Sequence, residues 1–102
     1  MRAAGQVSLP KDAVLVELRP ELLTFETRQV LLPATVVSMR LLMEGHAMPL
    51  QLPVVECLVV EKDRVGYIYQ LRFSLESLPG PDRDLIRLFI AKGRGSPELT
   101  AP

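Results

Sequence analysis

The sequence lacks features on which several classes of protein depend. It has no tryptophan, and aromatic residues make up 5% of the chain, so its core must be built mainly from leucine, valine, isoleucine and methionine. Twelve lysines and arginines balance twelve aspartates and glutamates, which removes the sequence-independent attraction to phosphate on which nucleic-acid binding mostly rests. The same balance argues against a polybasic membrane anchor. We therefore expect no nucleic-acid partner.

Cysteine and histidine are equally scarce. The single Cys57 cannot form an internal disulfide, which suits a reducing compartment, and a small buried hydrophobe explains it better than a nucleophile does. His46 has no second histidine to work with, so a turn residue is favoured over a general base. Asp82 and Asp84 suit a helix start better than a metal site. We expect no catalytic residues, no metal and no cofactor, and hence no enzyme.

Long apolar runs are also missing. None of the chain's apolar stretches could span a bilayer, and the N-terminus lacks the apolar core of a signal peptide. We therefore expect a cytoplasmic protein without membrane insertion. A length of 102 residues, 48% of them hydrophobic, is enough for one domain with a modest packed interior.

Most of the chain has the composition and alternation of β-strands. The stretch from Gln51 to Phe73 contains two apolar runs rich in β-branched and aromatic residues, joined by a charged turn, which is typical of a β-hairpin. Further strands are predicted over residues 13–18, 22–27 and 35–43, and residues 47–53 lead into the hairpin.

A helix is predicted over residues 81–92. Leu85, Ile86, Phe89 and Ile90 recur at the spacing of one helical face, and the glycine at position 93 provides a stop signal. Residues 1–12 are expected to form a flexible N-terminal arm and residues 93–102 a disordered tail. The folded domain is then residues 13–92.

Several strands followed by one amphipathic helix imply an antiparallel sheet whose open side the helix covers. Five or six short strands are better satisfied by closing the sheet, because closure removes exposed edges. The expected fold class is therefore mainly β: a small six-stranded antiparallel β-barrel with one C-terminal α-helix.

Five segments follow one another in the order of a known family's motifs. VELRPELLTF (16–25) stands where that family has V-D-L-S-x-x-G-L-x-F, and LLPATVVSMRLLMEG (31–45) resembles its next strand, L-P-x-G-x-x-v-x-l-x-l. PLQLPVVECLVVEKD (49–63), YIYQLRF (67–73) and PDRDLIRLFI (81–90) follow as its later strands and closing helix. Over about three quarters of its length, the chain resembles a PilZ domain, the small β-barrel family best known for binding cyclic di-GMP in bacteria. The resemblance implies a PilZ-like β-barrel.

The same resemblance implies that the ligand motifs are degenerate. The family grips cyclic di-GMP with an R-x-x-x-R pair ahead of the barrel, whose guanidinium groups hold phosphates and stack on guanine. Here only Arg2 precedes the barrel, and Gln6 stands four residues later. The second motif, D/N-x-S-x-x-G, meets Glu17, Arg19 and Leu22 instead, and leucine obstructs the close ligand approach that glycine permits. Arg2, Glu17 and Arg19 are thus the positions where remnants of ligand binding would fall.

Two functions follow from this comparison. The first is a non-enzymatic adaptor that acts through protein contacts in bacterial motility, such as type IV pilus function, or in cyclic di-GMP-related signalling, without binding cyclic di-GMP itself. The alternative is a receptor for cyclic di-GMP or another nucleotide, in which Arg2, Arg19 and Arg28 form a noncanonical site. Against that stands the simpler interpretation of Arg19 as an exposed ion pair with Glu17 at a strand end. A third hypothesis is that the domain serves only as an oligomerising module.

Overall fold

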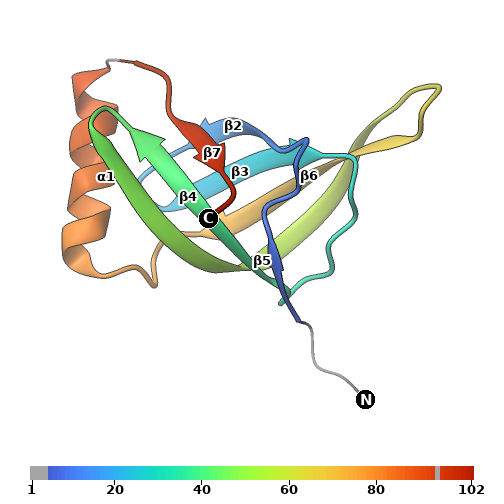
Figure 1. Ribbon diagram of the computed structural model, residues 1–102, viewed down its shortest axis with the longest axis horizontal. Helices are drawn as coiled ribbons and strands as arrows, with labels where there is room; N and C mark the ends of the chain where they lie inside the picture. Colours follow the sequence, from blue (N-terminus) through green and yellow to red (C-terminus); the bar gives the residue numbers. More distant parts are fainter. Residues whose placement is uncertain (1–4, 94) are drawn as a thin grey trace.

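The computed structural model is mainly β with one helix (Figure 1), and it describes residues 5–93 and 95–102. In chain order, its elements are β1 (Gln6–Ser8), β2 (Val14–Leu18), β3 (Leu22–Thr27), β4 (Val36–Met43), β5 (His46–Lys62), β6 (Tyr67–Ser74), α1 (Gly80–Lys92) and β7 (Glu98–Thr100).

A single curved sheet contains all of these strands. Its order is β1-β4-β5-β6-β3-β2, and β7 pairs with β4. The 17-residue β5 pairs with β4 along its first half and with β6 along its second half. It therefore joins the two halves of the sheet, and irregular pairing near Val55 and Val60 changes its register with β6.

We expected a lead-in and a separate strand where the structure has the single long β5. The chain contains Pro49 and Pro53 there, which cannot donate ladder hydrogen bonds. Val54 donates its N–H to Thr35 on the β4 side, and alternate residues of a strand point their N–H groups to the same neighbour. The missing donors of both prolines therefore fall on the other edge, where β6 does not pair.

The sheet is not closed into a barrel in the described part of the chain. β1 pairs in parallel with residues 36–38, and β7 pairs antiparallel with residues 40–42, so both occupy the same edge of β4. β2 ends the strand order close to β7, but no ladder joins these two strands. The expected six-stranded antiparallel barrel is thus corrected to an open seven-stranded sheet with one parallel pair. Alternation along a strand reveals its buried face, but not whether its edge finds a partner.

Two short strands lie in the segments that we expected to form a flexible arm and a disordered tail. β1 belongs to the expected arm, residues 1–12, and β7 to the expected tail, residues 93–102. Leu9 is buried, and its N–H donates to the carbonyl of Ser38 at 3.0 Å. The folded part therefore extends beyond residues 13–92 at both ends, because β4 offers a free edge that the composition of the termini does not reveal.

The core lies between the two halves of the sheet and α1. Phe25 and Phe73 are fully buried, with their rings stacked at a centroid distance of 5.2 Å. The half-buried strand predicted over residues 35–43 is confirmed as β4, in which every second side chain, from Val37 to Met43, is buried. Ile86 anchors α1 to this core.

The predicted helix is confirmed with one residue added at its start. Gly93 adopts the left-handed conformation (φ 63°) and donates its N–H to the carbonyl of Ile90 at 3.2 Å, which ends the helix as expected. In the described part of the chain, no helix has the length and apolar character needed to cross a membrane.

Candidate functional site

Glu17 and Arg19, two of the three predicted ligand residues, lie where β2 turns into β3. Backbone hydrogen bonds between Arg19 and Leu22, at 2.8 and 3.3 Å, close this tight turn. The Nε atom of Arg19 lies 2.8 Å from Oε2 of Glu17, and both side chains are partly exposed. The guanidinium thus has an anionic partner within the chain, as the ion-pair interpretation predicted. Arg2 lies outside the described residues.

Arg28 lies at the opposite end of β3 from this turn. It donates to both carboxylate oxygens of Asp63, one of them at 2.9 Å, in the turn between β5 and β6. Although desolvation acts in the opposite direction, these bonds, together with hydrogen bonds from the amides of Val65 and Gly66, hold the pKa of Asp63 well below its usual range. The same pairing raises the pKa of Arg28. The structure therefore does not bring Arg19 and Arg28 into one site.

Asp12 secures the same corner of the sheet. It accepts hydrogen bonds from the hydroxyl of Thr27 and from the amide of Arg28, the latter at 2.8 Å. Burial alone would raise the pKa of Asp12, but these hydrogen bonds and the nearby guanidinium bring it below its usual value. Asp12 therefore fixes the end of β3, and Arg28 connects that end to the β5–β6 turn through Asp63.

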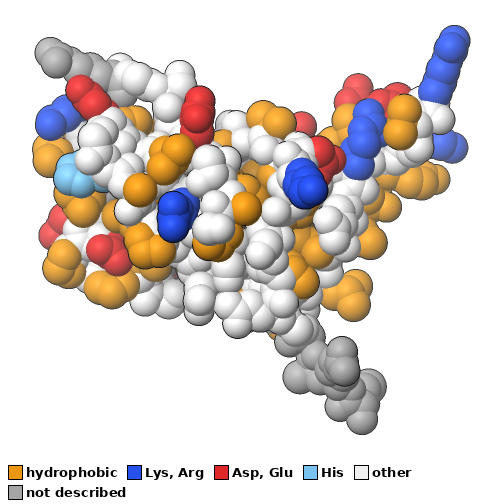
Figure 2. All heavy atoms as spheres, viewed as in Figure 1, with side chains coloured by type: hydrophobic (Ala, Val, Ile, Leu, Met, Phe, Trp, Pro, Cys, Tyr) orange, Lys and Arg blue, Asp and Glu red, His pale blue; other side chains and the backbone are white. Residues whose placement is uncertain are grey.

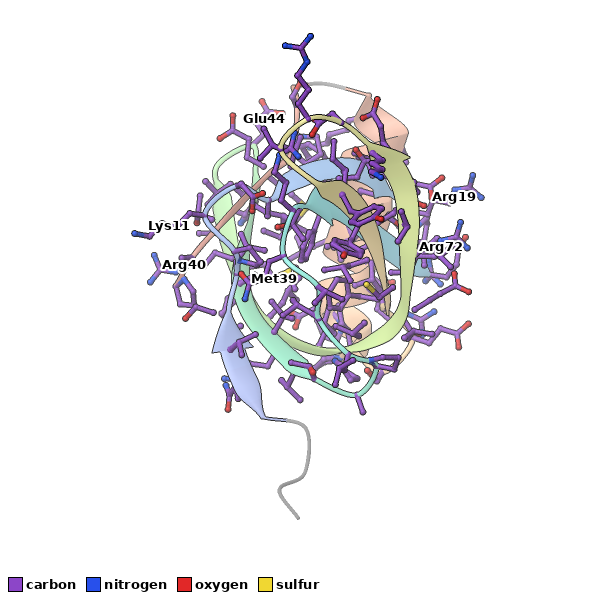
Figure 3. The ribbon with its side chains drawn as sticks, turned by 90° about the vertical axis from the view of Figure 1, so that its right-hand side faces the viewer. Lys11, Arg19, Met39, Arg40, Glu44 and Arg72 are labelled. Atoms are coloured by element: carbon purple, nitrogen blue, oxygen red, sulfur yellow. The ribbon has the colours of Figure 1, made fainter. Side chains whose placement is uncertain are left out.

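A polar row that the sequence did not predict crosses the face of the sheet opposite to the core. Glu17 pairs with Thr24, Thr24 with Arg72, and Arg72 with Glu56, on four adjacent strands. Arg72 lies 3.2 Å from Glu56, while its Nε atom and the hydroxyl of Thr24 are buried without a hydrogen-bond partner. Arg19 and Arg72 point outward on the same side of the molecule (Figure 3). Alternation in YIYQLRF signalled the outward position of Arg72, but the irregular pairing of β5 concealed its partner.

The β5–β6 hairpin projects from the body of the domain (Figure 1). Several of its apolar side chains are exposed. Five of them, each at least 40% exposed, form what we call the hairpin patch: Leu58, Val59, Val60, Val65 and Tyr67. In Figure 2, hydrophobic side chains gather at this corner beneath basic ones. Val59 pairs with Tyr69 and Leu58 with Gln70, so the patch includes both faces of the hairpin. Several exposed apolar side chains gathered on one projecting element are typical of interaction sites.

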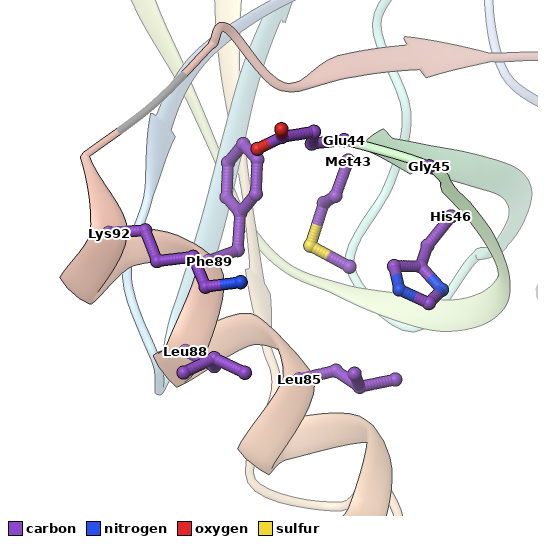
Figure 4. Close-up of a pocket in the computed structure, with 8 residues that line it drawn as sticks. All are labelled: Met43, Glu44, Gly45, His46, Leu85, Leu88, Phe89 and Lys92. Carbon is purple, nitrogen blue, oxygen red and sulfur yellow. The ribbon is translucent and has the colours of Figure 1, made fainter.

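A hollow of about 370 Å³, which we call the end pocket, lies between α1 and the β4–β5 turn (Figure 4). Four apolar side chains form its walls, and polar residues with one glycine form its rim. The lining residues are Met43, Glu44, Gly45, His46, Leu85, Leu88, Phe89 and Lys92. His46, which we expected in the turn, is the exposed first residue of β5 and directly follows the turn.

Nowhere in residues 5–93 and 95–102 do three potential metal ligands come together. Cys57 is half-buried and unpaired with another cysteine. Comparisons of the chain with protein-family models, curated proteins and solved structures gave no significant match. Its function must therefore be argued from these surfaces themselves.

Proposed function

We propose that this chain is a non-enzymatic adaptor domain with a PilZ-like fold, which acts through protein contacts in bacterial motility or cyclic di-GMP-related signalling. It works in the cytoplasm and does not bind cyclic di-GMP itself. The order of the sequence motifs supports the family, and a mainly β structure with one helix near its C-terminal end is compatible with it.

The observation that carries the adaptor proposal is the hairpin patch. A strand pair that extends beyond its own core cannot bury both faces, and Val65 at the turn is 79% exposed. The bidentate contact of Arg28 with Asp63 holds the turn in place. A hairpin that is fixed in position and apolar on its surface loses little freedom when a partner covers it, which favours binding.

A second observation supports the absence of cyclic di-GMP binding. At the degenerate motif, Arg19 is engaged by Glu17, so a phosphate would have to compete with a carboxylate already in contact. Arg28, the other cation invoked for a noncanonical site, is engaged by Asp63 at the far end of β3. Each guanidinium therefore has a competing partner within the chain.

Affinity capture from a lysate of the native host tests the adaptor function. We expect the tagged domain to enrich one protein in stoichiometric amounts, and the double substitution Val59→Ser and Val65→Ser to lower that enrichment at least tenfold. Loss of about 1.4 kcal/mol of apolar contact is sufficient for a tenfold effect. Quantitative mass spectrometry of the captured fraction measures the change.

The matched control is Val14→Ser with Val16→Ser, which removes two exposed valines of β2, a strand that pairs with β3 and with neither strand of the hairpin. This control should retain full enrichment. If the hairpin variant captures as much protein as the wild type, or if both variants lose it equally, the patch is not the contact surface.

Calorimetric titration with cyclic di-GMP addresses the nucleotide-receptor alternative. That alternative is favoured by one observation, the unpartnered Nε of Arg72 and hydroxyl of Thr24 near the β2–β3 turn. We expect no binding heat even well above micromolar nucleotide, because Glu17 and Glu56 occupy the two nearby guanidinium groups. Micromolar binding that Arg19→Ala abolishes would establish the receptor function instead.

A further inference from the structure

We propose that the end pocket binds a single-chain carboxylate, with a medium-length alkyl tail against α1 and its anionic head at Lys92. This site is separate from the hairpin patch, and the proposal does not depend on the adaptor function.

The tail site is an apolar stripe on one face of α1. Leu85, Leu88 and Phe89 stand at positions i, i+3 and i+4, so their side chains lie along one side of the helix. Leu85 and Phe89 also pack against the core, whereas Leu88 is 53% exposed. Met43, which is buried, faces them from the end of β4. An alkyl chain laid here would cover the exposed part of Leu88.

The head site is the cation that continues this stripe. Lys92 stands at i+7, and its ammonium group points into the hollow (Figure 4). Within the described part of the chain, Lys92 takes part in none of the ion pairs. His46 borders the hollow from β5. Glu44, the one acidic lining residue, lies beside the Phe89 ring (Figure 4). The Glu44 carboxylate repels an anionic head group, which should therefore lie at Lys92.

The dimensions of the pocket set the length of the tail. Lys92 follows Leu85 by seven positions, so the stripe extends about 10 Å along the helix axis. A volume of about 370 Å³ falls in the lower part of the range for small-molecule sites, about 300–1,000 Å³. Both dimensions suit an alkyl chain near eight carbons, and octanoate is therefore the probe of choice.

The test is a titration of the full chain, followed by amide chemical shifts, with octanoate, octanol and octylammonium. These probes share one chain length and differ in head charge. We expect octanoate to bind, with shifts concentrated in residues 43–46 and 85–92, octanol to bind more weakly and octylammonium most weakly. Hexanoate should bind about fifteenfold more weakly than octanoate, because each buried methylene contributes about 0.8 kcal/mol.

Three variants locate the site. Leu88→Gln should weaken octanoate binding about tenfold, whereas its matched control Ile90→Gln, which changes an exposed residue of α1 outside the pocket lining, should leave it unchanged. Lys92→Met should reduce the affinity for octanoate to that for octanol, without altering octanol binding. The proposal is overturned if millimolar octanoate causes no shifts, if the shifts centre on residues 58–67, or if octylammonium binds as tightly as octanoate.

Discussion

Replacing Phe73 by alanine is expected to lower the free energy of unfolding by about 4 kcal/mol, because truncating a buried phenylalanine costs about 3–5 kcal/mol. Phe73 is fully buried, and its ring stacks on Phe25 at 5.2 Å, an arrangement that contributes about 0.5–1.5 kcal/mol beyond area burial. It pairs with Leu23 on one side and Val54 on the other. Since domains of this size have about 5–15 kcal/mol in total, the variant should lose between about a quarter and four fifths of its stability.

Urea unfolding followed by circular dichroism measures this loss, and Tyr67→Ala is its matched control. Tyr67 lies on the same strand and is 46% exposed, so its loss should cost about 1 kcal/mol or less. Phe73→Leu, which keeps most of the buried volume, should cost less than about 1.5 kcal/mol. Equal losses for Phe73→Ala and Tyr67→Ala would show that β6 does not carry the core residue assigned to it.

Some elements of the fold could be predicted from the sequence, and others could not. The strand over residues 22–27 and the helix over residues 81–92 depend on local alternation, helical spacing and a terminal glycine, and the structure has them almost unchanged. β1 and β7 could not be foreseen, because their pairing depends on the vacant edge of β4, more than twenty residues away from either in sequence. The open form of the sheet could not be foreseen for the same reason, because it too depends on which strand edges find partners.

The candidate sites were also predictable from the sequence only in part. Leu85 and Phe89 belong to the helical face predicted from spacing, whereas Leu88 was not assigned to it. The position of this stripe opposite Met43 depends on how α1 crosses the end of the sheet. Likewise, the pairing of Arg28 with Asp63 joins residues 35 apart in sequence. Sequence patterns tell which face a side chain occupies, whereas its partner across the fold depends on register and packing.

Replacing Ile86 by alanine is expected to lower the free energy of unfolding by about 3 kcal/mol, within the range of about 2–5 kcal/mol for such buried truncations. Ile86 is fully buried, and among the described residues it is the one buried residue of α1. A 13-residue helix is marginal in water without tertiary contacts, since isolated helices shorter than about 12–15 residues rarely persist. In this variant, the helix should therefore unfold before the sheet does.

Hydrogen exchange separates this local effect from general unfolding, and Ile90→Ala is the matched control, because Ile90 is 37% exposed on the same helix. In Ile86→Ala, the amides of residues 83–92 should lose protection while those of β3 and β6 keep theirs, and octanoate binding should fall as the helical wall of the end pocket detaches. Ile90→Ala should change neither. Uniform loss of protection in all elements would mean that α1 and the sheet unfold as one cooperative unit, in which case the helix could not open the pocket independently of the core.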